Sequence, residues 1–251
     1  MPRTLFIGDV HGCLEELDEL VYALALGQAD RLFFLGDLVD RGPDSVGVIR
    51  RVRELLVRYP GSACIAGNHE EKNLRYREKG REGPAWWTKA DDDDWAFLDS
   101  LPLFHRLPGT LLVHGGLYQA FFDAYGTLDD PPANWRSDRG KRAERAARFL
   151  RVRQVSPEGQ MVPFGDVVPG AVHWTSRYDG REGFCFFGHD PQIEPPYVLR
   201  AEHAMGLDTG CCFGGRLTAA VISEGVAPSA AAIVSVTARS QYATPRQLHG
   251  D

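Results

Sequence analysis

The strongest constraint on the fold is a set of five short apolar runs, each ending at a glycine that stands beside an Asp, Asn or His. The runs cover residues 5–7, 32–35, 63–66, 111–113 and 184–187. Apolar runs of this length, bounded by turn-forming residues, are typical of buried β-strands. We therefore expect an α/β fold whose buried strands end in polar side chains.

The first third of the chain alternates strands with helices. Predicted strands cover residues 4–7, 31–35 and 62–66, and apolar residues recur at helical spacing in 14–26 and 45–59. This βαβαβ order implies parallel strands that are joined by right-handed crossovers.

The pattern changes twice further along the chain. Residues 70–105 are polar and predict helix, and the acidic run 91–94 is typical of a solvated turn or helix start. Residues 139–153 predict a basic helix, and the pattern becomes rich in strands from residue 184 onward. A mixed α/β protein is therefore expected.

Length and charge limit the classes of function. The 251 residues show no internal repeat or linker, which favours one domain at 1–236 followed by a polar tail at 237–251. The formal net charge of -6 disfavours non-specific binding of nucleic acid, which depends on Lys and Arg. Neither a signal segment nor an apolar run of membrane-spanning length is found, so we expect a cytoplasmic protein with no membrane partner.

The five cysteines form no recognisable motif. Their number is odd, and no pair has C-x-x-C spacing. The sequence therefore predicts neither a disulfide framework nor a cysteine-based zinc site.

Polar side chains at the ends of the predicted strands indicate a metal centre. In an open α/β sheet, ligands gather beyond the carboxyl ends of the strands. Carboxylate, amide and imidazole donors suit divalent first-row metals, and a pair of ions can hold a phosphate for in-line displacement. The candidate ligands are Asp9, His11, Asp37, Asn68, His114 and His189. The competing interpretation of these residues is turn formation and helix capping.

Three further residues have the chemistry of phosphate-ester hydrolysis. His69 could protonate a leaving oxygen, and Asp40 could orient its imidazole. Arg41 could bind phosphate oxygens through two parallel hydrogen bonds. The alternatives are a structural histidine and a surface ion pair.

Five sequence blocks together resemble a known family. GDVHG at 8–12, GDLVDRG at 36–42, GNHE at 67–70, HGG at 114–116 and GH at 188–189 are similar to the ordered signature of the phosphoprotein-phosphatase family of calcineurin-like metallophosphoesterases. The resemblance implies a four-layer αββα sandwich of two mixed sheets. It also implies two divalent metal ions, with Mn²⁺ as the first expectation and Fe, Zn, Co or Ni as alternatives.

The resemblance assigns roles to residues of this chain. The first metal ion would be held by Asp9, His11 and Asp37. The second would be held by Asp37, Asn68, His114 and His189. His69 and Asp40 would form the general-acid pair. Substrate contacts would come from Arg41, Asn68, Arg177 and Arg153.

Two classes of substrate remain possible, because the chain resembles two branches of this family. The block LDTGCCFGGRLT at 207–218 resembles bacterial symmetrical diadenosine tetraphosphatases, which implies a nucleotide cleaved to two ADP. Asp40 and the segment 174–180 instead resemble bacterial Ser/Thr, possibly dual-specificity, protein phosphatases, which implies a phosphoprotein. Capped RNA ends and a non-catalytic scaffold are further alternatives. Asp208 could either orient a ligand histidine or form a turn.

Overall fold

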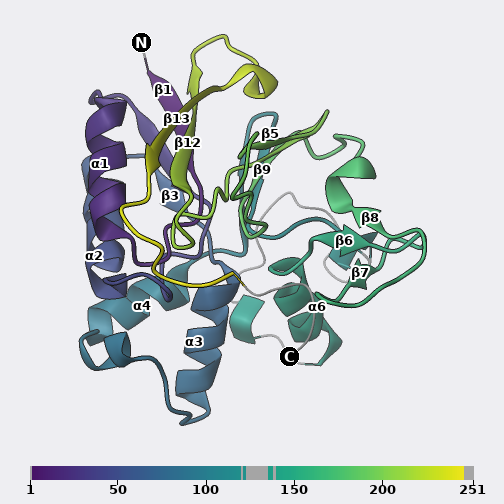
Figure 1. Ribbon diagram of the computed structural model, residues 1–251, viewed down its shortest axis with the longest axis horizontal. Helices are drawn as coiled ribbons and strands as arrows, with labels where there is room; N and C mark the ends of the chain where they lie inside the picture. Colours follow the sequence, from purple (N-terminus) through teal and green to yellow (C-terminus); the bar gives the residue numbers. More distant parts are fainter. Residues whose placement is uncertain (1, 120, 123–134, 138–139, 246–251) are drawn as a thin grey trace.

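The computed structural model describes residues 2–119, 121–122, 135–137 and 140–245. Two five-stranded sheets lie at its centre (Figure 1). The first sheet has the order β13-β12-β1-β2-β3. Its strands are β1 (Arg3–Ile7), β2 (Arg31–Phe34), β3 (Ala63–Cys64), β12 (Arg216–Ser223) and β13 (Ala232–Thr237).

The second sheet has the order β10-β11-β9-β5-β4. Its strands are β4 (Phe104–Leu107), β5 (Thr110–Val113), β9 (Phe184–Phe187), β10 (Leu199–Arg200) and β11 (Ala204–Gly206). A small third sheet contains β6 (Gln154–Val155), β7 (Met161–Val162) and β8 (Val172–His173). The α-helices are α1 (Leu14–Leu24), α2 (Ser45–Arg58), α3 (Asn68–Glu78), α4 (Asp92–Ser100) and α6 (Lys141–Phe149). Short 3₁₀ segments cover Ala85–Thr88, Trp135–Ser137, Trp174–Ser176 and Pro228–Ala230.

The strand pairings confirm the parallel start of the fold and make both sheets mixed. β1 pairs in parallel with β2, and β2 with β3. In the second sheet, β9 lies parallel to both β5 and β11. β12 adds antiparallel to β1, and β4 adds antiparallel to β5. The carboxyl ends of β1, β2, β3, β5 and β9 therefore supply the loops that build the site.

The two sheets pack face to face with helices outside them. Between the sheets, the ring of Phe6 on β1 stacks on Phe186 of β9 at a centroid distance of 4.0 Å. The alternate residues Leu5 and Ile7 belong to a second buried cluster, which also contains apolar residues of α1 and α2. On the outer side of the second sheet, Phe149 of α6 belongs to the same cluster as Leu5 and Ile7. This arrangement confirms the expected αββα sandwich.

The segment 70–105 differs from the expectation at its end. Residues 104–107 form β4 rather than helix, because Pro108 and Gly109 make a tight turn that returns the chain as β5. Gly109 has a positive φ of 68°, which a glycine adopts without strain. The small third sheet was also not predicted, since strands of two residues give no periodic signal.

The acidic run 91–94 starts a helix, as its sequence indicates. The Asp91 side chain caps α4 by accepting a hydrogen bond from the Asp94 backbone at 2.9 Å. Asp94 is buried rather than solvated, and it forms ion pairs with Arg50 and Arg53 of α2. The acidic run therefore links α4 to α2 through these ion pairs.

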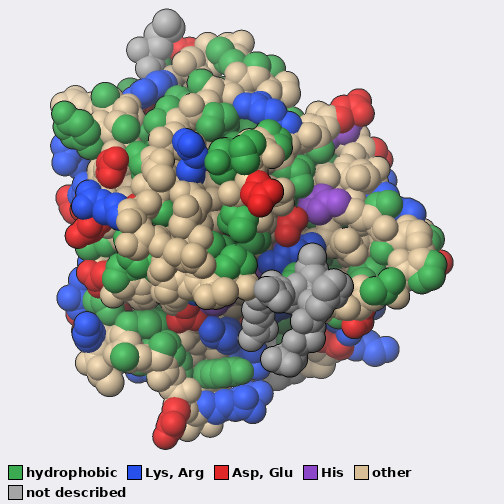
Figure 2. Space-filling model, in the orientation of Figure 1, with side chains coloured by type: hydrophobic (Ala, Val, Ile, Leu, Met, Phe, Trp, Pro, Cys, Tyr) green, Lys and Arg blue, Asp and Glu red, His purple; other side chains and the backbone are tan. Residues whose placement is uncertain are grey.

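The part of the tail that the structure describes is bound to the domain. The Tyr242 hydroxyl donates to Glu16 on α1 at 2.8 Å, and the Tyr242 amide donates to the Cys212 carbonyl at 2.9 Å. Residues 246–251 of the expected tail lie outside the described residues. Basic and acidic side chains are interspersed on the face in Figure 2. Among the described residues, no helix has the length and apolar character needed to cross a membrane.

Candidate metal centre

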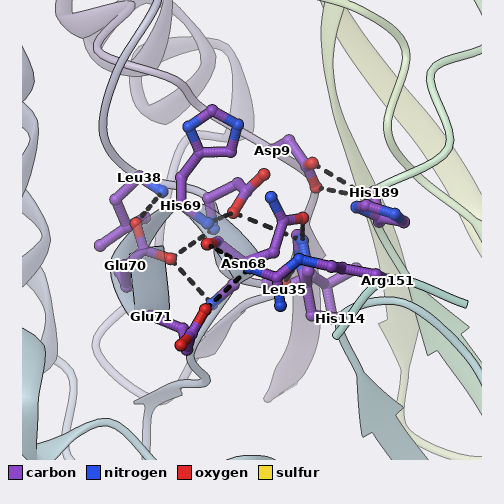
Figure 3. A network of polar contacts seen from close by, with 12 residues as sticks. Asp9, Leu35, Leu38, Asn68, His69, Glu70, Glu71, His114, Arg151 and His189 are labelled. Carbon is purple, nitrogen blue, oxygen red and sulfur yellow. Dashed lines mark hydrogen bonds and ion pairs between the residues drawn. The ribbon is translucent and has the colours of Figure 1, made fainter. Parts of the chain in front are cut away.

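The loops after five strands bring the predicted ligands to one place. Figure 3 labels four of them, Asp9, Asn68, His114 and His189. The ligands come from the loop after β1, the loop after β2, the start of α3, and the residues directly after β5 and β9. In that order they are Asp9 with His11, then Asp37, Asn68, His114 and His189. Five of the six are buried, and Asn68 is half-buried. The convergence expected from the sequence is therefore present in the fold.

Asp37 lies between two groups of potential ligands. Its Oδ2 is 3.4 Å from Nε2 of His11, and its Oδ1 is 3.4 Å from Nε2 of His114. In one group the ligand atoms of Asp37, His11 and His69 lie within 4.8 Å of one another, and in the other those of Asp37, His114 and His189 do. A carboxylate with one oxygen toward each group is placed to bridge two ions.

Hydrogen bonds fix which nitrogen of each imidazole faces Asp37. Nδ1 of His11 lies 2.9 Å from the Val39 carbonyl, and Nδ1 of His114 lies 2.7 Å from the Leu35 carbonyl. An Nδ1 that donates to a carbonyl leaves Nε2 as the nitrogen with a lone pair. The rings are therefore oriented as metal ligands before any ion binds.

The donor set fits divalent metal ions. Nε2 of His189 is buried and has no hydrogen-bond partner among the described residues. Buried polar atoms are nearly always paired, so this nitrogen lacks a partner that an ion would supply. Oδ1 of Asn68 lies 3.1 Å from Nε2 of His114, which puts an amide oxygen beside the second group. Mixed oxygen and imidazole donors suit first-row metals.

The electrostatics of the carboxylates also favour a cation. Burial, together with the charges of Asp208 and Asp37, raises the pKa of Asp9 well above its usual range. A divalent ion would relieve this cost of ionisation. Burial lowers the pKa of His11 to about 3, so this imidazole is neutral and able to bind a metal at neutral pH.

The backbone is strained where the ligands sit. Seven non-glycine residues in the described chain have a positive φ. Five of them belong to the site, namely His11, Asp37, Asp40, Arg41 and His189. Such conformations cost about 1–3 kcal/mol each and concentrate at functional sites. The surrounding hydrogen bonds must therefore hold these side chains in place.

Glu70 is a central part of that support. Its Oε2 accepts hydrogen bonds from the amides of Asp37 and Gly67, and its Oε1 accepts one from Leu38, all at 2.8 Å. Burial and the charge of Asp37 raise the pKa of Glu70 to about 7. No role was predicted for Glu70 from the sequence, although a Glu at the third helical position is the sign of a capping box.

The two residues that the sequence suggests as an acid pair, His69 and Asp40, are in contact. Nδ1 of His69 lies 2.7 Å from Oδ2 of Asp40, and the rings of His69 and His11 are 4.7 Å apart. Burial alone would raise the pKa of Asp40, but the hydrogen bond with His69 and the charge of Lys72 hold it well below its usual value. Asp40 therefore stays ionised beside the imidazole. The contact with Lys72, at 2.6 Å, was not predicted.

Arg41 lies at the centre. One of its terminal nitrogens is 3.2 Å from Nε2 of His11, and its guanidinium lies over the ring of Phe213 at 4.8 Å from the centroid. Asp208, from the same block, accepts a hydrogen bond from the Gly210 amide at 3.0 Å, which is the turn-forming role. No hydrogen bond from Asp208 to a ligand histidine occurs in the described part of the chain.

The other predicted arginines lie at different distances from the ligands. Arg153 donates to the His189 carbonyl at 2.7 Å and to Asp190 at 2.9 Å. Arg177 instead donates to the Pro157 carbonyl and lines a separate cavity of about 120 Å³. The structure thus places Arg153 beside the ligands, whereas Arg177 lines a separate cavity that contains none of them.

Arg151 is a residue of the site that the sequence analysis did not select. It donates to Glu71 at 2.7 Å and to the Asn68 carbonyl at 3.4 Å, and it points into the centre in Figure 3. The sequence feature that could have indicated Arg151 is its position two residues before Arg153 in a basic segment.

Comparisons with known proteins agree with this geometry. A family model described as calcineurin-like phosphoesterase matches residues 2–192. The chain belongs to the calcineurin-like phosphoesterase family, whose members are metal-dependent hydrolases.

Several relatives are similar over most of their length. The symmetrical bis(5'-nucleosyl)-tetraphosphatase of Serratia proteamaculans is 31% identical, over 86% of this chain and 89% of the relative. The asymmetrical bis(5'-nucleosyl)-tetraphosphatase PrpE of Oceanobacillus iheyensis is 28% identical, over 85% of this chain and 86% of the relative. A crystal structure named "putative diadenosine tetraphosphatase" is 27% identical with a TM-score of 0.68, over 94% of this chain and 93% of that one. A yeast serine/threonine phosphatase, 16% identical with a TM-score of 0.59, shares the fold.

Proposed function

We propose that this phosphoesterase uses two divalent ions, Mn²⁺ in the first instance, to cleave diadenosine tetraphosphate symmetrically into two ADP. The first ion is assigned to Asp9, His11 and Asp37. The second is assigned to Asp37, Asn68, His114 and His189. These assignments rest on the two ligand groups that share Asp37 and on the buried, unpartnered nitrogen of His189. We also propose that the protein acts in the cytoplasm.

The chain's own residues supply the remaining chemistry. When bound, the ions neutralise phosphate charge and lower the pKa of the attacking water. Because Nδ1 of His69 is held by Asp40, its Nε2 is the nitrogen that gives a proton to the leaving phosphate oxygen. Arg41 binds phosphate oxygens of the substrate and stabilises their charge in the transition state. Asn68 and Arg153 add contacts, and Arg177 meets the part of the substrate that extends into its cavity.

The placement of the 207–218 block carries the choice of substrate. This block is the part of the sequence that most resembles diadenosine tetraphosphatases, and its Phe213 lies under the guanidinium of Arg41. Asp208 of the same block lies close enough to Asp9 to raise its pKa. The block that resembles this branch therefore places Phe213 against Arg41 and the charge of Asp208 near Asp9, which is assigned to the first ion. The names of both relatives support a dinucleoside tetraphosphate as the substrate, and that of the Serratia proteamaculans relative supports symmetrical cleavage.

A Ser/Thr protein phosphatase is the second candidate, because Asp40 is present and is held by several donors. The test is to compare kcat/KM of the Mn²⁺-loaded protein for diadenosine tetraphosphate and for a phosphoserine peptide. The proposal expects the nucleotide to be preferred by at least about 100-fold, which is about 2.7 kcal/mol in transition-state binding. Faster dephosphorylation of the peptide would overturn it.

A further inference from the structure

A second cluster of metal-binding side chains lies outside the centre described above. The sulfur atoms of Cys13 and Cys211 and a carboxylate oxygen of Glu16 lie within 4.8 Å of one another. All three residues are at most 1% exposed. The cluster joins the start of α1 to the segment that follows β11. Its cysteines are far apart in the sequence, so no short spacing could reveal it.

The carboxylate of Glu16 is only partly satisfied. Its Oε1 accepts hydrogen bonds from the Arg239 amide at 2.9 Å and the Tyr242 hydroxyl at 2.8 Å. Its Oε2 is buried and has no hydrogen-bond partner among the described residues. An unpaired carboxylate oxygen in the interior is costly, so the residue is placed to meet a partner that these side chains do not provide.

The thiol of Cys13 does not cap the helix that follows it. Cys13 occupies the N-cap position of α1, where Ser, Thr, Asp and Asn are preferred, yet its side chain makes no capping bond. Its sulfur lies 3.6 Å from the His11 carbonyl and is also in hydrogen-bond contact with the Cys211 thiol. The thiol therefore points into the cluster instead of capping the helix.

We propose that Cys13, Glu16 and Cys211 bind a thiophilic divalent cation of the zinc class. Two sulfur donors and one carboxylate are a ligand set that zinc accepts, and thiolate donors select such ions over Mn²⁺. A metal binds the thiolate, so binding releases the thiol protons to solvent.

An ion at this position would connect three parts of the molecule. Cys13 is two residues from His11, and Cys211 is next to Cys212, whose thiol lies beside Arg41. Tyr242 and Arg239 of the C-terminal segment lie over the Glu16 carboxylate. The site is nevertheless chemically separate from the catalytic centre, whose assigned ligands contain no sulfur.

The absence of sulfur from the catalytic centre makes the proposal testable by spectroscopy. The metal-free, reduced protein is titrated with Co²⁺, and the near-ultraviolet charge-transfer band from thiolate to cobalt is recorded. We expect the wild-type protein to show the band. Cys13→Ser and Cys211→Ser should lose it, and Glu16→Gln should weaken Co²⁺ binding by about tenfold or more. Cys185→Ala, a buried cysteine of β9, is the matched control and should keep the band.

A second readout needs no variant. Zn²⁺ should protect Cys13 and Cys211 of the wild-type protein from alkylation, as judged by peptide mass spectrometry, while the labelling of Cys185 stays unchanged. Absence of the charge-transfer band, its persistence in Cys13→Ser and Cys211→Ser, or equal labelling with and without Zn²⁺ would overturn the proposal. A Cys13–Cys211 disulfide that forms without binding metal would also overturn it. Hydrolysis of the nucleotide does not enter either readout, so this inference and the proposed function can fail separately.

Discussion

Nδ1 of His69 lies 2.7 Å from Oδ2 of Asp40, at the edge of the ligand cluster. The same carboxylate accepts hydrogen bonds from Asn73 at 3.0 Å and, on its other oxygen, from Trp86 at 2.8 Å. Asp40 has a positive φ of 70°, so these contacts hold a strained residue in place. The pair leaves Nε2 of His69 as the nitrogen that can exchange a proton with substrate.

Replacing His69 with Ala should reduce turnover without emptying the metal centre. We expect kcat for diadenosine tetraphosphate to fall by about 10²–10⁴-fold, the usual contribution of a general acid. An aryl phosphate with a good leaving group should lose much less, because it does not need protonation. Elemental analysis should find unchanged metal content. His203→Ala, which replaces a half-buried histidine outside the centre, is the control. Equal small losses for both substrates would contradict the acid role.

Replacing Asp37 with Ala or Asn should remove both metal ions. The residue is shared by the two ligand groups. Losing its carboxylate leaves the first ion with Asp9 and His11 alone, and the second with only the neutral donors Asn68, His114 and His189. Elemental analysis after desalting should give close to no bound Mn²⁺. Asp18→Asn, on the exposed side of α1, should keep the wild-type content. Full occupancy in the Asp37 variants would rule out the bridging role.

Replacing Gly188 with Ala should weaken metal binding through a steric clash. A Cβ at this position would lie 2.1 Å from Oδ1 of Asp9 and 3.5 Å from Nδ1 of His114. The Asp9 carboxylate must then move, and we expect the affinity for Mn²⁺ to fall by about tenfold or more. Gly27→Ala is a matched control because its Cβ would make only ordinary contacts. Isothermal titration calorimetry measures the Mn²⁺ affinity of both variants. Equal affinities would show that the close approach of Gly188 to the Asp9 carboxylate is unimportant.

The ion pair of Arg3 and Asp30 should make stability depend on acid pH. Burial alone would raise the pKa of Asp30, but hydrogen bonds from Arg3 and Gly27 lower it. A carboxylate whose pKa is lowered by folding stabilises the protein above its unfolded pKa of about 3.9, and this contribution is lost as the pH falls through the folded value.

Asp30→Asn should therefore lower the free energy of unfolding by about 1–3 kcal/mol at neutral pH. The difference from wild type should shrink as the pH falls from about 5 toward 2. Urea denaturation at several pH values measures it, with the exposed Asp18→Asn as control. A difference that is constant over this range would contradict the assigned cause.

The sequence predicted the parts of the fold that have long apolar patterns. β5 and β9 fall at the predicted residues, and α1 ends two residues before the predicted limit. The predicted ligands also converge, because loops after neighbouring parallel strands must meet. Pairings of two residues, as in the third sheet, carry no such pattern and could not be predicted.

The contacts that support the site were largely hidden from the sequence. Glu70 was part of a quoted motif, but its bonds to the amides of the loop after β2 depend on tertiary structure. Lys72 lies one helical turn after His69 and reads as an ordinary surface charge until Asp40 is placed beside it. Cys13 and Cys211 became neighbours only through folding.

The most direct test of the central claim is chromatography of the products formed from diadenosine tetraphosphate by the Mn²⁺-loaded protein. The proposal predicts ADP as the sole nucleotide product, with no formation by Asp37→Ala. Formation of ATP together with AMP would place the cleavage at an asymmetrical position and contradict the assigned reaction. No nucleotide product, with rapid release of phosphate from a phosphoserine peptide, would instead identify a protein phosphatase.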